Sequence, residues 1–268
     1  LYKGKARTTA MGYNASVLSI GTATYPLIGG ALAMLGWRYP FALPIVAVPV
    51  GLLVLFSLKS PEPRNKQPLG IYIVKVWRSL HNVQVLGLLL GGFVTFVVLY
   101  GSYLTFLPFL VEGSFGGSPV DIGLIMCAAS VATAVTSVRL GALARRFSER
   151  WLLTGAYVLY AVSLLLIPLM PSMWLLLIPS ALYGVAAGLN IPNIISLLAG
   201  LAPMTRRAAL MSINGMVLRL GQTIGPLVMA GVLAGWSLRA VFFAGALFSL
   251  GMFVVAVIMI RQVDEPGA

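Results

Sequence analysis

The chain has 268 residues, of which 59% are apolar and only 9% are charged, and its mean hydropathy is +0.98. A soluble domain of this length needs far more charge to cover its surface, so this composition excludes one. A net charge of +12 would suggest a nucleic-acid partner in a soluble protein, which makes the position of each basic residue along the chain decisive here.

Eight apolar runs follow one another along the chain. Each has roughly 20 residues or more, the length that a helix needs to cross a hydrocarbon core about 30 Å thick. Only helices and closed barrels satisfy their backbone in lipid, and runs this long and this uniformly apolar predict helices. The predicted spans are residues 10–34, 39–58, 83–111, 119–143, 151–170, 173–199, 208–234 and 238–260.

Basic residues are concentrated in alternate connections between these spans. They precede the first span, separate the second from the third and the fourth from the fifth, precede the seventh and follow the eighth, whereas the other connections carry only Arg38 and Arg239. This is the positive-inside pattern, and it predicts that both ends of the chain are cytoplasmic. The charge is therefore a topology signal: we expect the lipid bilayer as a partner and no nucleic acid.

Residues that hold metals or form disulfides are scarce. Cys127 is the single cysteine and sits in an apolar span, while the single histidine, His81, lies in a loop beside basic residues. We therefore expect no disulfide framework, no metal site and no bound cofactor.

The beginning of the chain is repeated near its end. With a shift of 200 positions, Arg7, Asn14, Gly21 and Pro26 fall on Arg207, Asn214, Gly221 and Pro226. The first two predicted helices thus repeat the last two, and counting predicts a repeat of six helices. We expect residues 1–58 to be the last two helices of an N-terminal half, 59–82 a central cytoplasmic loop, and 83–268 a complete C-terminal half. Roughly four further helices are expected to precede this chain.

Three short motifs accompany this repeat. The first predicted helix contains a glycine–proline pattern, half-matched in the seventh: Gly21, Pro26, Gly29, Gly30, and Gly221, Gly225, Pro226. A second motif follows the fourth helix, with Gly141, Arg146 and Arg150 at its fixed positions. The third is Gly36-Trp37-Arg38.

With these motifs, essentially the whole chain resembles the twelve-helix drug:proton antiporters of the major facilitator superfamily. Tyr25 stands where that family has a glycine, and Arg145 where it has an aspartate. The resemblance implies an all-α polytopic membrane fold, with the eight spans as the fifth to twelfth helices. It also implies a monomeric carrier of the bacterial inner membrane that exports lipophilic, drug-like small molecules by alternating access and uses the proton gradient.

The same resemblance points to two helices that would line a substrate cavity, the seventh and the tenth. The seventh carries an aromatic stripe that includes Phe96, Tyr100 and Tyr103, and the tenth carries Tyr183, Asn190 and Asn193 along one face. Amides are costly in a membrane unless they face protein or water. These residues either line the cavity or pack and hydrogen-bond between helices.

Arg219 lies near the middle of the seventh predicted span, with Gln222 on its face. A central arginine is costly in lipid, so we expect it to face inward with a partner. It acts either in coupling or substrate binding, or in a structural ion pair or a clamp on backbone carbonyls. No acidic residue lies near the middle of a span.

Two other functions make different demands on the sequence. A carrier for a small metabolite such as an organic anion or a sugar accommodates Arg219 almost as well. A membrane enzyme would need clustered Cys, His or acidic side chains at membrane depth, and the sequence has no such cluster. The sequence therefore predicts a carrier and not an enzyme.

Overall fold

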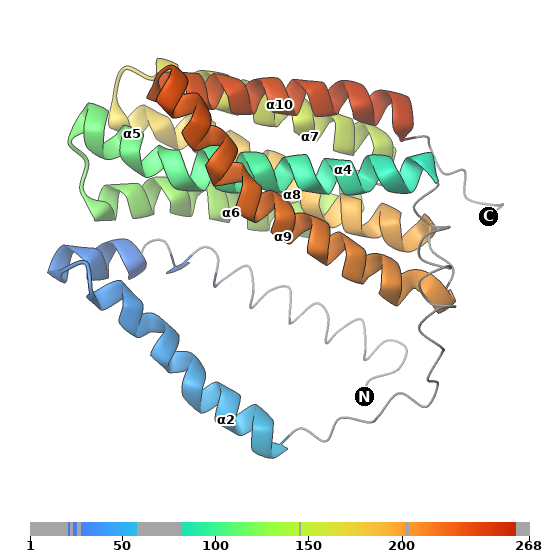
Figure 1. Ribbon diagram of the computed structural model, residues 1–268, viewed down its shortest axis with the longest axis horizontal. Helices are drawn as coiled ribbons and strands as arrows, with labels where there is room; N and C mark the ends of the chain where they lie inside the picture. Colours follow the sequence, from blue (N-terminus) through green and yellow to red (C-terminus); the bar gives the residue numbers. More distant parts are fainter. Residues whose placement is uncertain are drawn as a thin grey trace.

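The computed structural model describes residues 21, 24, 25, 28–57, 82–144, 146–201 and 204–260. Every regular element among them is helical (Figure 1). In chain order they are η1 Tyr39–Val46, α2 Ala47–Ser57, α4 Val83–Val98, η2 Leu99–Leu104, α5 Thr105–Phe115, α6 Pro119–Ala144, α7 Glu149–Leu166, η3 Ile167–Leu169, η4 Met173–Leu176, α8 Leu177–Leu201, α9 Met204–Gly235 and α10 Leu238–Met259.

Seven helical stretches in the described part of the chain are long and apolar enough to cross a membrane. They confirm the second to eighth predicted spans: Tyr39–Ser57, Val83–Phe115, Pro119–Ala144, Glu149–Leu169, Met173–Leu201, Ala209–Gly235 and Leu238–Met259. Of the first predicted span, residues 28–34 are helical and most of the rest lies outside the described residues, as does the loop 59–81. The protein is thus an all-α, multi-pass membrane protein.

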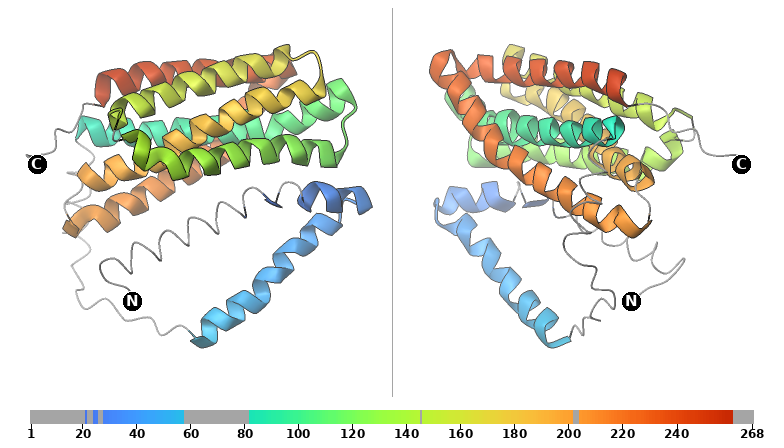
Figure 2. Two further views of the ribbon diagram at one scale, coloured as in Figure 1. Left: turned by 180° about the vertical axis from the view of Figure 1, so that it is seen from behind. Right: turned by 45° about the vertical axis from the view of Figure 1, so that its right-hand side comes forward.

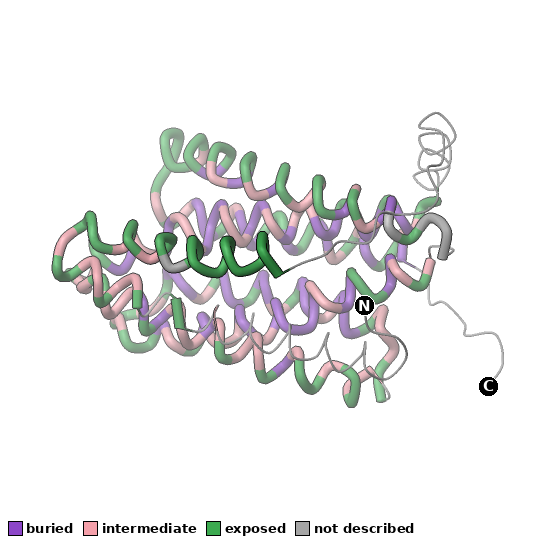
Figure 3. The backbone as a smooth tube through the Cα atoms, turned by 90° about the horizontal axis from the view of Figure 1, so that it is seen from below, coloured by how far each residue is buried: buried purple, intermediate pink, exposed green. Residues whose placement is uncertain are grey.

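The second span differs from the prediction in the type of helix at its start. Residues Tyr39–Val46 form a 3₁₀ helix that contains Pro44, and only Ala47–Ser57 is α-helical. Proline has no N–H and its ring clashes with the carbonyl four residues earlier, which disfavours an α-helix there. None of the residues of α2 is buried (Figure 3), so α2 contributes nothing to the core of the described bundle.

The six membrane-length stretches between Val83 and Met259 form the bundle (Figures 1 and 2). α8 packs between α6 and α7, α7 packs against α10, and α10 packs against α4. The helix α9 crosses the face of α4 and its continuation η2. The core consists of apolar side chains and of tyrosines from α7, α8 and η2.

Short polar side chains fix where several helices begin. The side chain of Ser148 accepts a hydrogen bond from the N–H of Trp151 at the start of α7, and Ser237 accepts one from Ala240 at the start of α10. Asn82 accepts from the N–H of Gln84 at the start of α4. These caps satisfy amide groups that a helix leaves unpaired at its first turn.

Glycines let α6 and α8 approach at backbone distance. A methyl group at Gly184 would overlap the carbonyl of Ala129, and one at Gly188 would lie 2.7 Å from the carbonyl oxygen of Thr133. The hydroxyl of Thr133 also donates to the carbonyl of Gly184 at 3.0 Å. Small residues and hydroxyls are the usual means of joining helices in lipid, where apolar surface alone provides little attraction between them.

Candidate functional site

A cavity beside the core lies between η2, α6 and α8. It has a volume of about 370 Å³ and includes Tyr25 from the N-terminal segment on its wall. Its remaining lining residues are Leu99, Tyr100, Tyr103, Leu104, Met126, Ala129, Ser130, Thr133, Tyr183, Ala187 and Ile191. We call this space the aromatic cavity.

Two of its tyrosines are stacked face to face. The rings of Tyr103 and Tyr183 lie 4.2 Å apart between centroids with an interplanar angle of 8°, and Tyr160 packs on Tyr183 at 4.8 Å. Tyr103 and Tyr183 are buried, and neither hydroxyl has a partner in hydrogen-bond geometry among the described residues, although that of Tyr103 interacts with Ser180. The stacked rings form an aromatic wall of the cavity.

A π-helical segment carries the cavity tyrosines of the seventh helix. Residues Leu99–Leu104 interrupt the α-helix between α4 and α5. The hydroxyl of Thr105 donates to the carbonyl of Tyr100 at 2.6 Å, and that of Ser102 donates to the carbonyl of Val241 on α10 at 3.2 Å. Such segments occur frequently at functional sites. Sequence reasoning missed this one, although Gly101-Ser102 in the middle of an apolar span is a signal for an irregular helix.

No residue with a charged side chain is among those that line the aromatic cavity. Its polar groups are tyrosine hydroxyls and the hydroxyls of Ser130 and Thr133, and both of the latter donate within α6, to Met126 and Ala129. A mostly apolar cavity with few polar groups binds bulky lipophilic ligands, and tyrosine faces also attract organic cations.

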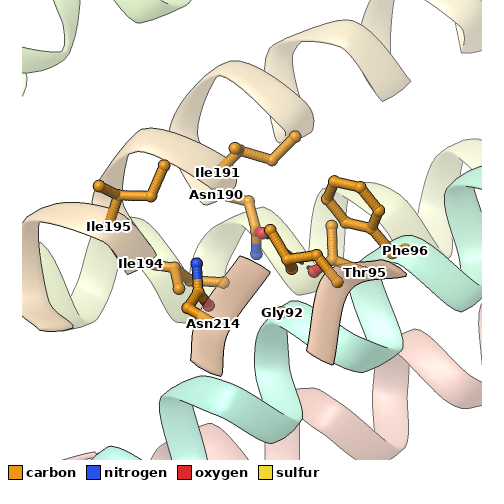
Figure 4. A pocket seen from close by; sticks show the side chains of 9 residues that line it. Gly92, Thr95, Phe96, Asn190, Ile191, Ile194, Ile195 and Asn214 are labelled. Atoms are coloured by element: carbon orange, nitrogen blue, oxygen red, sulfur yellow. Dashed lines mark hydrogen bonds between the residues drawn. The ribbon is translucent and has the colours of Figure 1, made fainter. Parts of the chain in front are cut away.

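The predicted cavity residues separate into two places. Tyr100, Tyr103 and Tyr183 line the aromatic cavity. Phe96 stacks on Tyr100 at 5.6 Å, but it lines a separate small space together with Asn190 (Figure 4). The hydroxyl of Thr95 donates to Asn190 there, at 3.0 Å.

Asn193, also on α8, contacts the start of α7 instead. Its amide donates to the carbonyl of Glu149 at 2.7 Å, and the guanidinium of Arg150 donates to the carbonyl of Val257 on α10 at 2.6 Å. Both contacts tie helix ends together. The other two loop-motif residues, Gly141 and Arg146, are exposed.

Arg219 and Gln222 do not line the aromatic cavity. The guanidinium of Arg219 donates to Gln222 at 2.7 Å, and Arg219 is exposed. At 1.5 Å per residue it lies about 15 Å beyond Ala209, the start of this membrane span, and therefore near the middle of the bilayer. Among the described residues Arg219 lies on a face of α9 that carries few buried residues, so the inward orientation expected from the sequence stays a prediction.

Some of the motif glycines lie where two helices are in close contact, and others do not. Gly221 and Gly225 of α9 pack against the backbone of α4 at Phe93 and Val97. Pro226, the next residue, also lies within α9. Gly30 lies against the carbonyl of Pro119, at the start of α6. A side chain at Gly29 would meet no atom within 4 Å, and one at Gly21 would meet only the ring of Tyr25. Pro26 is outside the described residues.

Known proteins resemble this chain along nearly all of its length. It is 25% identical over 260 residues to Multidrug resistance protein 2 of Bacillus subtilis (strain 168), covering 92% of this chain and 64% of that protein. It is 26% identical over 251 residues to Multidrug resistance protein MdtG of Enterobacter lignolyticus (strain SCF1), covering 90% and 59%. Quinolone resistance protein NorA of Staphylococcus aureus (strain N315) is 25% identical over 182 residues, or 68% of this chain and 46% of that protein.

The chain thus spans less than two thirds of the length of these relatives. The sequence model of the Major Facilitator Superfamily matches residues 1–116 and 110–268, which together include every residue of the chain. The match is consistent with the helical architecture and with the seven membrane-length helices of the described residues. The protein belongs to the Major Facilitator Superfamily.

Proposed function

We propose that this protein takes part in the export of lipophilic, drug-like compounds across the bacterial inner membrane by alternating access. The observation that carries the proposal is the aromatic cavity: about 370 Å³, lined by four tyrosines and no charged side chain, inside a bundle of membrane-length helices. The names of the relatives, which state multidrug and quinolone resistance, support the same class of substrate.

Energy from the proton gradient is part of this proposal, as is a topology with both ends of the chain in the cytoplasm. The described carboxylates all lie near helix ends: Glu112 near the end of α5, Asp121 in the first turn of α6, and Glu149 at the start of α7. Proton coupling usually requires a carboxylate at membrane depth. The proposal therefore assigns that group to a part of the transporter that this sequence does not include.

Dye transport in everted membrane vesicles tests this proposal. The protein is expressed as its gene encodes it in a strain without other drug pumps, and ethidium uptake is measured with and without a proton uncoupler. We expect uptake that the uncoupler abolishes, because everted vesicles accumulate what the cell exports. Correctly inserted protein that moves no ethidium or related dye would contradict drug export.

A metabolite carrier for small organic anions is the second candidate, and Arg219 favours it. This cation is exposed near the middle of a span, and it donates a hydrogen bond to the neutral side chain of Gln222. An anionic substrate or a carboxylate from another helix would each relieve the cost of placing the charge there. Vesicles that exchange a radiolabelled organic anion and ignore the dye would favour this candidate.

Under either candidate we expect Arg219→Gln to lower the rate of energised transport by roughly tenfold or more. Without the guanidinium, the anionic substrate or carboxylate that pairs with Arg219 is left unpaired at membrane depth, which costs over about 1.4 kcal/mol, equivalent to a factor of ten. The matched control is Arg239→Gln, which removes an exposed arginine at the start of α10. Initial rates and substrate range are compared at equal amounts of protein. Unchanged rates and range in Arg219→Gln would reject a role in coupling or binding.

A further inference from the structure

A second apolar space lies along α6 and α8, on the side of α6 opposite to the aromatic cavity. It is an open groove of about 530 Å³. Ala128, Val131 and Val135 line it at spacings of three and four residues, so they form one stripe along α6. Ser130 and Thr133, which line the aromatic cavity, lie on the other side of the same helix. We call this second space the outer groove.

The outer groove is apolar and open to the surroundings of the described bundle. Among its lining residues the polar groups are the thiol of Cys127 and the hydroxyl of Thr136, and none is charged. Val131 and Val135 are 49 and 50% exposed. Because α6 is a membrane-length helix, the groove lies at membrane depth. An acyl chain fits such a groove, since lipid tails are flexible and as apolar as its walls.

An unpaired cation continues the stripe at one end of the groove. Arg139 follows Val135 by four residues, so it lies on the same side of α6. It is exposed and forms no hydrogen bond or ion pair with another described residue. Glu149, a carboxylate at this end of the bundle, accepts from Ser196 instead. Arg139 lies about 7.5 Å before the end of α6 at Ala144, which lets its long side chain reach the headgroup region.

We propose that the outer groove binds an anionic phospholipid, with one acyl chain along the stripe and the phosphate on the guanidinium of Arg139. The forked donors of arginine match a phosphate group. One leaflet of hydrocarbon is about 15 Å deep, or about ten helical residues, so a chain that starts at Arg139 covers Val135 and Val131.

The charge at this end of the groove selects the headgroup. Arg146, in the turn after α6, is a second exposed cation. A zwitterionic headgroup would bring its own ammonium close to these two arginines, whereas an anionic headgroup adds no positive charge. The site does not depend on the proposed drug export, because it lies on the other side of α6 from the aromatic cavity.

Photocrosslinking with two lipid probes tests this site. The protein, expressed as its gene encodes it, is placed in phosphatidylethanolamine vesicles with a trace of phosphatidylglycerol or phosphatidylethanolamine that carries a diazirine on the same acyl chain. We expect the phosphatidylglycerol probe to label residues 124–136 roughly fivefold or more above the other probe. The α10 surface around Leu247, which is 71% exposed, should take up both probes equally. Equal labelling of residues 124–136 by the two probes would mean ordinary lipid contact and overturn the proposal.

Variants of Arg139 test its part in this preference. Arg139→Gln should bring the labelling ratio of the two probes at residues 124–136 to about one, and Arg139→Lys should keep most of the preference, because a positive charge remains. The matched control is Arg239→Gln, which removes an exposed arginine at the start of α10 and should leave the ratio unchanged. A preference that persists in Arg139→Gln would contradict a headgroup site at this residue.

Discussion

Replacing Ser130 with tryptophan should abolish transport while leaving the protein folded. Ser130 lines the aromatic cavity from α6, and its hydroxyl donates only to the carbonyl of Met126 in its own helix. An indole at this position fills space that a substrate would occupy, without breaking a contact between helices. We expect the initial rate of dye uptake in everted vesicles to fall by roughly tenfold or more. A substrate that can no longer fill the cavity loses over about 1.4 kcal/mol of binding free energy, which corresponds to a factor of ten.

The control is Val138→Trp, two turns further along α6. Val138 is 84% exposed, so the added ring extends away from the bundle. Its transport rate should match that of the wild type. Normal transport by correctly inserted Ser130→Trp would show that the cavity is not on the substrate's path.

The second large effect is expected on folding, from Gly184→Leu. The Cβ atom of the new side chain would overlap the carbonyl group of Ala129, at 2.8 Å from its carbonyl carbon. The helices α6 and α8 would therefore have to separate. Separation also breaks the hydrogen bond from Thr133 to the carbonyl of Gly184. We expect the Tm of the purified protein in detergent to fall by roughly 5 °C or more, or the folded yield to collapse.

Gly155→Leu is the matched comparison for this variant. Gly155 also lies inside a helix, α7, but a side chain there would meet no atom within 4 Å. Its Tm should stay within about 2 °C of the wild type, because leucine is also the better helix former. If both variants lost stability equally, close packing at Gly184 would not be the cause.

The presence and approximate extent of the helices were predictable from the sequence, because backbone N–H and C=O groups in lipid must form hydrogen bonds within the span. The spans predicted at 83–111 and 173–199 appear as Val83–Phe115 and Met173–Leu201. Both spans begin at the predicted residue and end further along the chain. Local features such as Gly116 after α5 decide where a helix ends, whereas hydropathy registers only where the apolar run fades. The 3₁₀ start of the second span depends on Pro44, and the π-helical segment depends on contacts with α10 such as that of Ser102. A hydropathy pattern contains neither kind of information.

The candidate site was predictable in part. Tyr100, Tyr103 and Tyr183 line one cavity, whereas the sequence left open whether these residues line a cavity or pack between helices. Asn190 and Asn193 share that face of α8 but reach different neighbours, Thr95 and the carbonyl of Glu149. Helical periodicity gives the direction of a side chain, whereas its partner depends on which helix packs there, and a single sequence does not contain that information.

Substrate protection of a cysteine in the aromatic cavity tests the central claim most directly. Cys127 is the single cysteine of this sequence. Cys127→Ala, together with replacement of any cysteine that the gene encodes outside this sequence, provides a background in which Ser130→Cys is the only thiol, and Phe147→Cys in the exposed loop after α6 serves as control. In active membranes, saturating ethidium should slow maleimide labelling of Ser130→Cys and leave that of Phe147→Cys unchanged. Labelling of Ser130→Cys at the same rate with and without ethidium, in protein that still transports the dye, would contradict substrate binding in this cavity.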